Sequence, residues 1–595
     1  MSTPTADEGA TTADETVSES ERTATVAESR DAENRLAYLE RFPEAAKLVR
    51  ACFLVAFAAL GVGGLFGMVQ ALHRTDVFRG FISSADYYTV LTGHGVLLVL
   101  VFTTFFIAGI FAWAVTKSLD RPFTSMRLAW TWFGLMTLGT VMAAAAILAG
   151  LVPSLDISAD VLFTFYAPLQ AHPLFYVGAA LIIVASWLAG ANYFLTFRAW
   201  RKDNPDERIP LQTFMVLTTM LMWYLSTIGV AIEVVVFLIP WSLGFVDQVD
   251  PLTMRTLFWY FGHPVVYFWL LPAYLVWYTI MPKLAGGRLF SDPLARVVFV
   301  LFLLLSTPTG FHHQYLDPGI PEGFKMIAMT NTMMLLLPSL LTAFTVVASI
   351  EHGARQRGGT GRLGWLRSLP WENPAFSGCA LAGLMFAAGG FSGMINAGMN
   401  INYLVHNTLW VPGHFHLTVG TAFALTAMAI AYWLVPQITG KRLKHRTIAA
   451  VQPFIWFIGM FLMSNAMHRA GLLGVPRRTA EPEYNVVDAS FSGAAGSYSE
   501  MRIQIAVGGT LLFVSLAMFV FVMARTWLSY KSERIEVNGA IPEPLSGPDH
   551  SPVVLDNMRL WLAIAVLLVL LTYAIPVVGL LSDGVFGPGA PAVPV

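Results

Sequence analysis

The sequence predicts an all-α, polytopic membrane bundle of about thirteen transmembrane helices. Of the 595 residues, 56% are hydrophobic and only 12% are charged, whereas soluble domains carry about 25% charged residues. The mean hydropathy is +0.61, and apolar runs long enough to cross a bilayer recur along nearly the whole chain. A β-barrel would instead show short segments of alternating hydrophobicity.

Composition divides the chain into three regions. Residues 1–40 are rich in Ser, Thr, Ala, Asp and Glu, which predicts a disordered, acidic tail on the cytoplasmic side. Residues 45–585 hold the transmembrane domain, and residues 586–595 form a C-terminal tail. The expected spans lie near 48–73, 84–116, 124–150, 170–198, 211–240, 253–281, 293–316, 326–350, 374–398, 405–436, 448–471, 501–530 and 557–582.

The basic connections predict the orientation of the chain. They follow even-numbered spans, at residues 117–121, 198–208, 355–367 and 441–446, and Lys531 and Arg534 after the twelfth span agree. Because positively charged loops stay in the cytoplasm, we expect the N-terminus inside and the C-terminus outside. The stretch 477–500 is then expected outside. The formal net charge of −1 gives no basis for nucleic-acid binding.

Cysteine and histidine usage narrows the chemistry. The two cysteines, Cys52 and Cys379, form no CxxC pair, so this chain alone cannot build a zinc knuckle or a dicopper site. Several of the 13 histidines fall inside apolar runs. Ionisable groups at membrane depth are rare and usually functional.

His414 and His416 lie one residue apart in an apolar stretch. On a helix their side chains point about 200° apart, so they are expected to serve two cofactors on opposite sides. His94 lies between Gly93 and Gly95. Because glycine has no side chain, the helix surface on both sides of His94 would let a flat macrocycle approach closely. Pairing His94 with His416 predicts a six-coordinate haem for electron transfer, and His414 would hold a second haem.

His263 and Tyr267 are four residues apart and share a helix face. Pro264 predicts a local distortion of the helix at this point. Taken alone, the pair is equally typical of an aromatic–histidine packing contact.

His312 and His313 are adjacent, so both can reach one metal only near a helix end. Gly310 and the Asp-Pro-Gly sequence at 317–319 predict such an end. With His263 they make three imidazoles, a set that suits copper or zinc and leaves a position open for a small ligand.

Together these residues resemble subunit I of the haem–copper oxygen reductases, over residues 45–585. The motifs are GHPVVY at 262–267, FHH at 311–313 and HFH at 414–416. The resemblance implies the following ligands: His94 and His416 for a low-spin haem, His414 for a high-spin haem, and His263, His312 and His313 for the copper called CuB. It also implies a covalent bond between Tyr267 and His263.

The resemblance further implies a terminal respiratory oxidase of a prokaryotic cell membrane that reduces O₂ to water and translocates protons. A phenol beside the copper can give an electron and a proton together. The expected cofactors are haem b at the low-spin site, an a-type or b-type haem at the high-spin site, and copper. The expected partners are a subunit II with a dicopper centre, an optional single-helix subunit, and cytochrome c or a blue copper protein as donor; a quinol donor stays open.

One departure indicates the branch of the family. Val265 stands where the mitochondrial-like branch carries a glutamate, so the chain resembles the B-type, ba(3)-type oxidases with a single proton path. Two stripes of hydroxyl groups could form that path, with interhelical hydrogen bonding as the alternative reading. Its residues are Tyr267, Tyr274, Tyr278, Ser291, Ser339, Thr342 and Thr345.

Four residues are expected near the haem propionates and the exit for protons and water. Arg477 and Arg478 would supply cations for the propionates, with an interfacial arginine pair as the alternative. His406 and Asn402 belong to the same region by resemblance, although the B-type pattern has an acidic residue at position 402. Glu233 lies inside a predicted span without an assignable role.

Two other functions share some of these features. A nitric oxide reductase has the six histidines but binds a non-haem iron, and its site needs a glutamate near that iron. Tyr267, and Val265 in place of an acid, favour copper over iron. A secondary transporter could use intramembrane histidines as proton relays.

Overall fold

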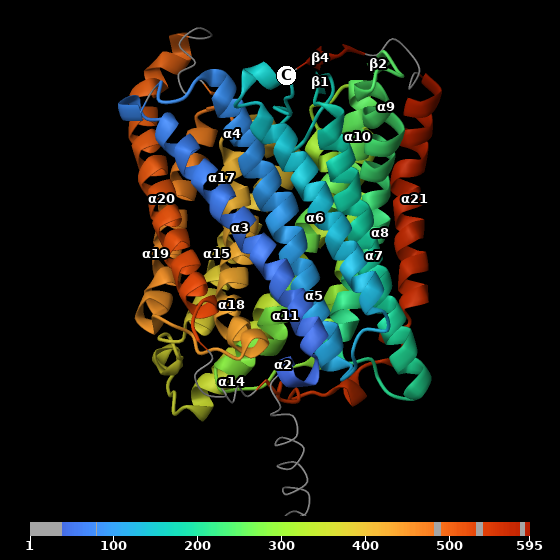
Figure 1. The fold of residues 1–595 in the computed structure, drawn as a ribbon, viewed down its shortest axis with the longest axis vertical. Coiled ribbons are helices and arrows are strands. Elements are labelled where there is room, and N and C mark those ends of the chain that lie inside the picture. Colours follow the sequence, from blue (N-terminus) through green and yellow to red (C-terminus); the bar gives the residue numbers. More distant parts are fainter. Residues whose placement is uncertain (1–37, 79, 481–488, 531–538, 584–589, 595) are drawn as a thin grey trace, which may run out of the picture.

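The structure, a computed structural model, describes residues 38–78, 80–480, 489–530, 539–583 and 590–594. Within this part the chain forms an upright bundle of long helices (Figure 1). Twelve are long and apolar enough to cross a membrane, and one bent pair makes a thirteenth candidate. The predicted all-α membrane bundle is therefore confirmed.

The candidate spans follow one another along the chain, with connections of very different length. In chain order they are α3 (Pro43–His73); α4, η2 and α5 (Ser84–Val96, Leu97–Phe102, Thr103–Ser118); α6 (Met126–Ala149); α7 (Pro173–Asp203); α8, η4 and α9 (Leu211–Ile232, Glu233–Leu238, Ile239–Ser242); α10 and α11 (Pro251–Gly262, Pro264–Leu284); α12 and η5 (Asp292–Leu305, Thr307–Gln314); α13 and α14 (Glu322–Met334, Leu336–Gln356); α15 (Pro374–Ala397); α17, η7 and α18 (Trp410–Leu417, Thr418–Phe423, Ala424–Thr439); α19 (Arg446–Leu472); α20 (Ala489–Trp527); and α21 (Met558–Asp583).

Short elements lie in the connections. They are α2 (Tyr38–Arg41), η1 (Asp76–Phe78), η3 (Pro153–Leu155), η6 (Gly364–Ser368), α16 (Met399–Val405), η8 (Pro548–His550) and η9 (Val553–Asp556). Strand β1 (Leu169–Gln170) pairs in parallel with β4 (Val593–Pro594), and β2 (Gln248–Val249) pairs antiparallel with β3 (Ala590–Pro591).

The ends of the chain differ from the sequence-based expectation. The predicted tail at 1–40 lies outside the described residues except for residues 38–40, which belong to α2. There Tyr38 is buried, and its hydroxyl lies 2.7 Å from that of Thr116. The described part of the predicted C-terminal tail forms β3 and β4, because its backbone pairs with two loops at one end of the bundle.

Helices break at the points that bear the predicted sites. Pro264 lacks an amide hydrogen, so α10 ends at Gly262 and His263 lies between two helices. The pair α12 and η5 bends by 52°. The π-helices η2 and η7 begin three and two residues after His94 and His416 respectively, and π segments are frequent at functional sites.

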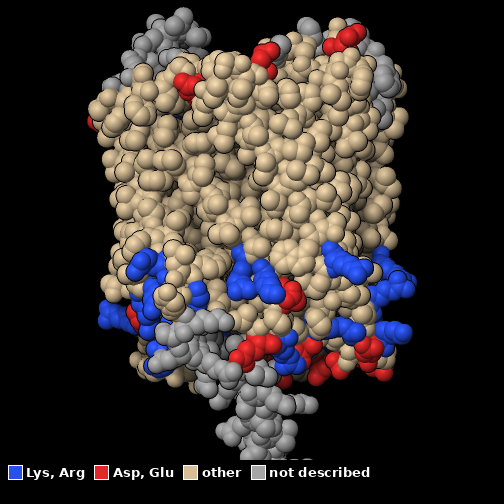
Figure 2. All heavy atoms as spheres, viewed as in Figure 1, with Lys and Arg blue, Asp and Glu red and all other residues tan. Residues whose placement is uncertain are grey.

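Charge separates the two ends of the bundle. Figure 2 shows Lys and Arg gathered around one end, the end at which α2 lies in Figure 1. A broad uncharged belt covers the face between the two ends, as expected for a surface in contact with lipid.

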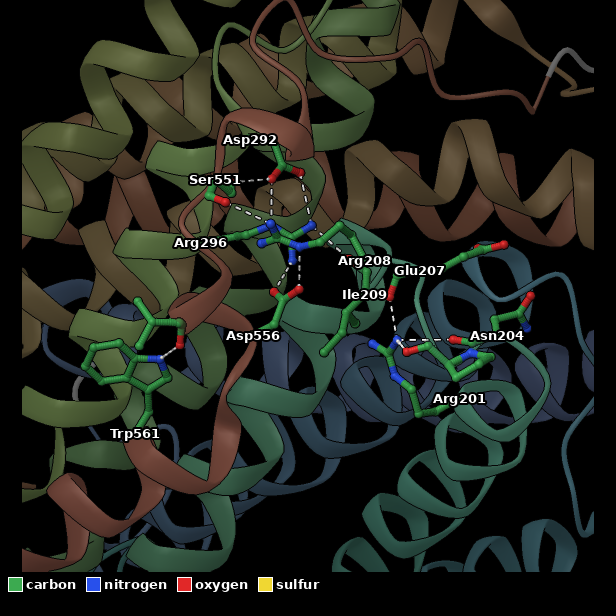
Figure 3. A network of polar contacts seen from close by, with 12 residues as sticks. Arg201, Asn204, Glu207, Arg208, Ile209, Asp292, Arg296, Ser551, Asp556 and Trp561 are labelled. Carbon is green, nitrogen blue, oxygen red and sulfur yellow. Dashed lines mark hydrogen bonds and ion pairs between the residues drawn. The ribbon is translucent and has the colours of Figure 1, made fainter.

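A buried ionic network fixes loops at the basic end (Figure 3). The Arg296 side chain is 1% exposed and pairs with Asp292 at 2.6 Å and with Asp556 at 2.8 Å. Arg208, at the end of the α7–α8 connection, also pairs with Asp556, at 2.7 Å. Arg296 donates to the Ile209 carbonyl at 2.8 Å as well. The network therefore joins α12, the α7–α8 loop and the segment before α21.

Arg296→Met is expected to lower the free energy of unfolding by about 3–5 kcal/mol, because it leaves Asp292 buried without its cation. The measurement is the thermal unfolding midpoint of the purified protein in detergent. Arg201→Met is the matched control, since Arg201 donates only to nearby loop carbonyls, including those of Asn204 and Pro205. Equal midpoints for the two variants would contradict a stabilising network.

Candidate functional site: two histidine-lined cavities

His94 on α4 and His416 on α17 face each other. Their ring centres are 6.3 Å apart and the ring planes differ by 18°. Nδ1 of His94 lies 2.8 Å from the Gly63 carbonyl, and Nδ1 of His416 lies 2.7 Å from the Pro412 carbonyl. Each ring therefore donates through Nδ1 and keeps Nε2 for a metal. Two metal–nitrogen bonds of about 2 Å each fit between these rings.

The two rings line a cavity of about 300 Å³ among α3, α4, α17, α19 and α20. Its wall is mainly apolar, and three arginines, Arg74, Arg477 and Arg478, also line it. Gly95 lines the cavity as well, whereas Gly93 does not: a Cβ there would meet the Phe66 ring at 2.7 Å. The expectation that Gly93 makes room for a macrocycle is therefore wrong. The absence of a side chain at Gly93 instead leaves room for the Phe66 ring.

His414 lines a second cavity, of about 530 Å³. The two histidines of α17 thus open onto different cavities, as their spacing predicts. Nδ1 of His414 lies 2.9 Å from the Gly389 carbonyl and 3.1 Å from the Ser392 hydroxyl, which again leaves Nε2 for a metal. A Cβ at Gly393 would meet the His414 ring at 2.8 Å, so this glycine makes room for the imidazole.

His263, His312 and His313 converge on the same second cavity. One ligand atom from each lies within 4.8 Å of the others. Nε2 of His313 is 3.1 Å from Nδ1 of His263 and 2.8 Å from Nε2 of His312. Metal–nitrogen bonds of about 2.0 Å would separate neighbouring ligands by about 3.3 Å. Within the described part of the chain, no carboxylate or thiol joins this group.

The surroundings orient these three imidazoles. Nδ1 of His312 lies 2.7 Å from the Thr332 hydroxyl on α13. The Trp259 indole stacks on the His313 ring, with 3.7 Å between centres and 7° between planes. The hydrogen-bond partner orients the His312 ring and favours metal binding, while the stacked indole holds the His313 ring in place.

Tyr267 lies beside His263 on the cavity wall. The ring centres are 4.9 Å apart at an angle of 67°. Nδ1 of His263 points to the other histidines, and its Nε2 is buried without a hydrogen-bond partner in the structure. That nitrogen is available to the tyrosine ring.

The hydroxyl groups of the expected proton path are brought together only in part. The Tyr278 hydroxyl donates to Thr342 at 2.8 Å, and the Tyr274 hydroxyl approaches Ser339 at 3.5 Å. Thr345 bonds the Leu341 carbonyl of its own helix. Ser291 caps α12 by accepting from the Leu294 amide at 3.3 Å. The α11 and α14 stripes therefore meet, while Ser291 and Thr345 serve their own helices.

The four residues expected near the propionates all line the second cavity. Arg477 donates to Asn407 at 3.0 Å, and Arg478 donates to Thr164 at 3.2 Å. Burial, and then the charge of Arg478, lowers the pKa of Arg477 to about 9. Half-buried cations crowded in this way fit a site for carboxylates.

His406 lies outside the transmembrane helix, contrary to its placement in a span at 405–436. It follows the last residue of α16, and the membrane helix begins at Trp410. Its Nδ1 lies 3.2 Å from the side-chain oxygen of Asn402. Burial, and then the charge of Arg477, lowers the pKa of His406 to about 4.

Sequence reasoning missed several residues of these cavities. Arg255 lines the second cavity and pairs with Asp317 at 2.8 Å, and its charge within a predicted span was an available indication. Thr332 and Trp259 carried no indication, since nothing in their sequence surroundings distinguishes them from packing residues.

Glu233 is fully buried at the start of η4, and neither carboxyl oxygen has a hydrogen-bond partner in the structure.

Comparison with known proteins decides the family. Residues 47–495 match the family described as Cytochrome C and Quinol oxidase polypeptide I. The chain belongs to this family of oxidase subunits. Cytochrome c oxidase subunit 1 of Thermus thermophilus is 43% identical over 553 residues, which cover 90% of this chain and 94% of the relative.

More distant relatives agree with that assignment. The alternative cytochrome c oxidase subunit 1 of Bradyrhizobium diazoefficiens is 24% identical over 83% of each chain. A solved structure of a haem–copper terminal oxidase dimer has a TM-score of 0.85 and 35% identity, and the match covers 92% of this chain and 95% of that one. The oxidase chain is thus a multi-pass membrane oxidoreductase of the haem–copper type. The secondary-transporter alternative is excluded.

Proposed function

We propose that this chain is the catalytic subunit of a terminal oxidase that reduces O₂ to water with electrons from cytochrome c or a blue copper protein. The arrangement of His263, His312, His313 and Tyr267 around the cavity that His414 also lines supports the proposal. It brings the three imidazoles of the triad, a phenol and a fourth histidine onto one cavity.

The proposed roles follow the geometry of the nitrogens. His94 and His416 would hold a low-spin haem, His414 a high-spin haem, and the triad would hold CuB. When bound, these groups supply electron transfer and oxygen activation. The single α17 helix would carry ligands to both haems, so it sets their separation and orientation.

Tyr267 would be bonded to His263 and act in the reaction itself. Its position beside the free Nε2 of His263 supports such a bond. There the phenol would be able to supply one electron and one proton to O₂; the resulting neutral tyrosyl radical would return to tyrosine with an electron from the proposed donor and a proton from the proposed path. Arg477 and Arg478 would bind haem propionates, with His406 and Asn402 near the exit for protons and water.

The triad supports copper over the non-haem iron of a nitric oxide reductase. Three imidazoles without a carboxylate suit copper. Val266, which lines the cavity, and Val265 follow His263 closely in the chain, so neither position supplies an acid. Together with the identity to the Thermus relative, Val265 supports the B-type, ba(3)-type branch.

Protons would come from the basic end through Tyr278, Thr342 and Tyr274. The hydrogen bond between Tyr278 and Thr342 supports this route. The clustering of Lys and Arg at that end supports a cytoplasmic orientation of it in a prokaryotic cell membrane. We further propose a subunit II with a dicopper centre, an optional single-helix subunit, haem b at the low-spin site and an a-type or b-type haem at the high-spin site.

Metal and haem analysis of the purified complex tests the proposed function. We expect two haem irons and one CuB per copy of this chain, with the copper of subunit II counted separately after that subunit is removed or mutated. A pyridine haemochrome spectrum identifies the haem types. A result of two haems, a third iron outside the haems and no CuB would contradict the oxidase assignment and favour a nitric oxide reductase.

Thr342→Val is expected to slow turnover by about tenfold, less than the factor of about 10²–10⁴ that a group transferring the reacting proton contributes. The substitution keeps the volume but removes the acceptor of the Tyr278 hydroxyl. Oxygen consumption and proton uptake are measured together. Thr345→Val is the control, because Thr345 bonds its own helix; an equal loss in both variants would contradict the route through Tyr278.

A further inference from the structure

Arg74 is a buried cation whose partners do not balance its charge. It follows the last residue of α3 and is 8% exposed. Its Nη2 donates to the Tyr87 hydroxyl at 2.8 Å, and its Nη1 has no hydrogen-bond partner in the structure. The groups that act on its charge are two phenols, Tyr87 and Tyr498. Among the side chains that the structure describes, then, no carboxylate neutralises this guanidinium.

Such an arrangement is costly unless an anion completes it. A buried charge without a counter-charge costs several kcal/mol in general. Arg74 lines the 300 Å³ cavity between His94 and His416. Arg74, whose Nη2 is anchored by the Tyr87 hydroxyl, thus lies at the wall of the space in which the low-spin haem would bind.

We propose that Arg74 is a third cationic partner of the low-spin haem and binds its propionate carboxylates together with Arg477 and Arg478. The inference rests on the proposed function, because it needs a haem between His94 and His416. A haem of this kind carries two carboxylates, and a forked guanidinium recognises a carboxylate through paired hydrogen bonds.

Arg74 differs from the other two arginines in which cavity it lines. Arg477 and Arg478 line both cavities, whereas Arg74 lines only the one between His94 and His416. A nearby cation favours the reduced, less positive haem. Arg74 should therefore raise the reduction potential of the low-spin haem selectively, whereas Arg478 acts on both haems.

Spectroelectrochemical titration of the whole purified complex tests this. Arg74→Leu is expected to lower the equilibrium constant for reduction of the low-spin haem at least about tenfold, which is 59 mV for a one-electron couple. The high-spin haem should shift less. Arg74→Lys keeps a cation and should restore most of the potential, and Arg478→Leu should move both haems.

Arg469→Leu is the matched control. Arg469 lies on α19, where it donates to Gln504 at an exposed position outside both cavities. If Arg74→Leu leaves the low-spin potential at the wild-type value, or shifts both haems equally, the inference is wrong. Equal loss of haem in the Leu and Lys variants would also overturn it, since packing alone would then explain the site. Absence of a low-spin haem from the wild-type protein would instead refute the proposed function.

Discussion

Tyr267→Phe is expected to abolish oxygen reduction while both haems and the copper stay bound. The side chain lies 4.9 Å from His263 between ring centres and faces the cavity of the triad. Phenylalanine keeps the ring but removes the hydroxyl proton, and a group that transfers the reacting proton contributes a factor of about 10²–10⁴. The measurements are oxygen consumption, haem spectra and copper content.

The control for this variant is Tyr260→Phe. Tyr260 is a tyrosine of α10 that lies outside the cavity and donates its hydroxyl to the Leu225 carbonyl at 3.1 Å. Its removal costs about 1 kcal/mol of stability and should leave turnover intact. Normal oxygen consumption by Tyr267→Phe would refute the role of the phenol.

His312→Ala is expected to lose the copper and all oxidase activity while both haems remain. Only two imidazoles of the triad are then left, and their nitrogens are the ones 3.1 Å apart on His263 and His313. The haem ligands lie on other elements, α4 and α17, and are untouched by the change. Metal analysis and haem absorbance, taken on the same sample, separate these outcomes.

Thr332→Val provides a graded comparison for the same site. It removes the partner of Nδ1 of His312, which lies 2.7 Å away. Losing such a partner typically costs about 10–100-fold in metal affinity, so copper should bind weakly and be recovered by added copper. Full copper occupancy in His312→Ala would exclude His312 as a ligand.

Several features of the fold were predictable because they depend on local composition. An apolar run of the right length forms a span wherever it lies in the chain, which is why α3 and α15 appear where expected. The helix break at Pro264 follows equally from a missing amide hydrogen. His406 was misplaced, because it follows a short separate helix, α16, and the membrane helix begins only at Trp410.

The sequence by itself determined the membrane bundle and the six histidines of the candidate site, since residue type and spacing inside an apolar run limit what they can do. The separation of His414 from His416 onto two cavities also follows from helix geometry alone. By contrast, the 6.3 Å spacing of His94 and His416 depends on tertiary packing, because α4 packs on α3, α17 packs on α19, and α20 packs on both α3 and α19.

Tertiary structure alone decided which groups surround the ligands. Thr332 and Trp259 lie on other helices than the rings they contact, and Arg74, at the end of α3, lines a cavity that α4, α17, α19 and α20 complete. Their roles depend on interhelical distances of a few ångströms and on burial, which removes solvent as an alternative partner. Sequence patterns record neither quantity, so a buried guanidinium at a cavity wall became visible only in the folded chain.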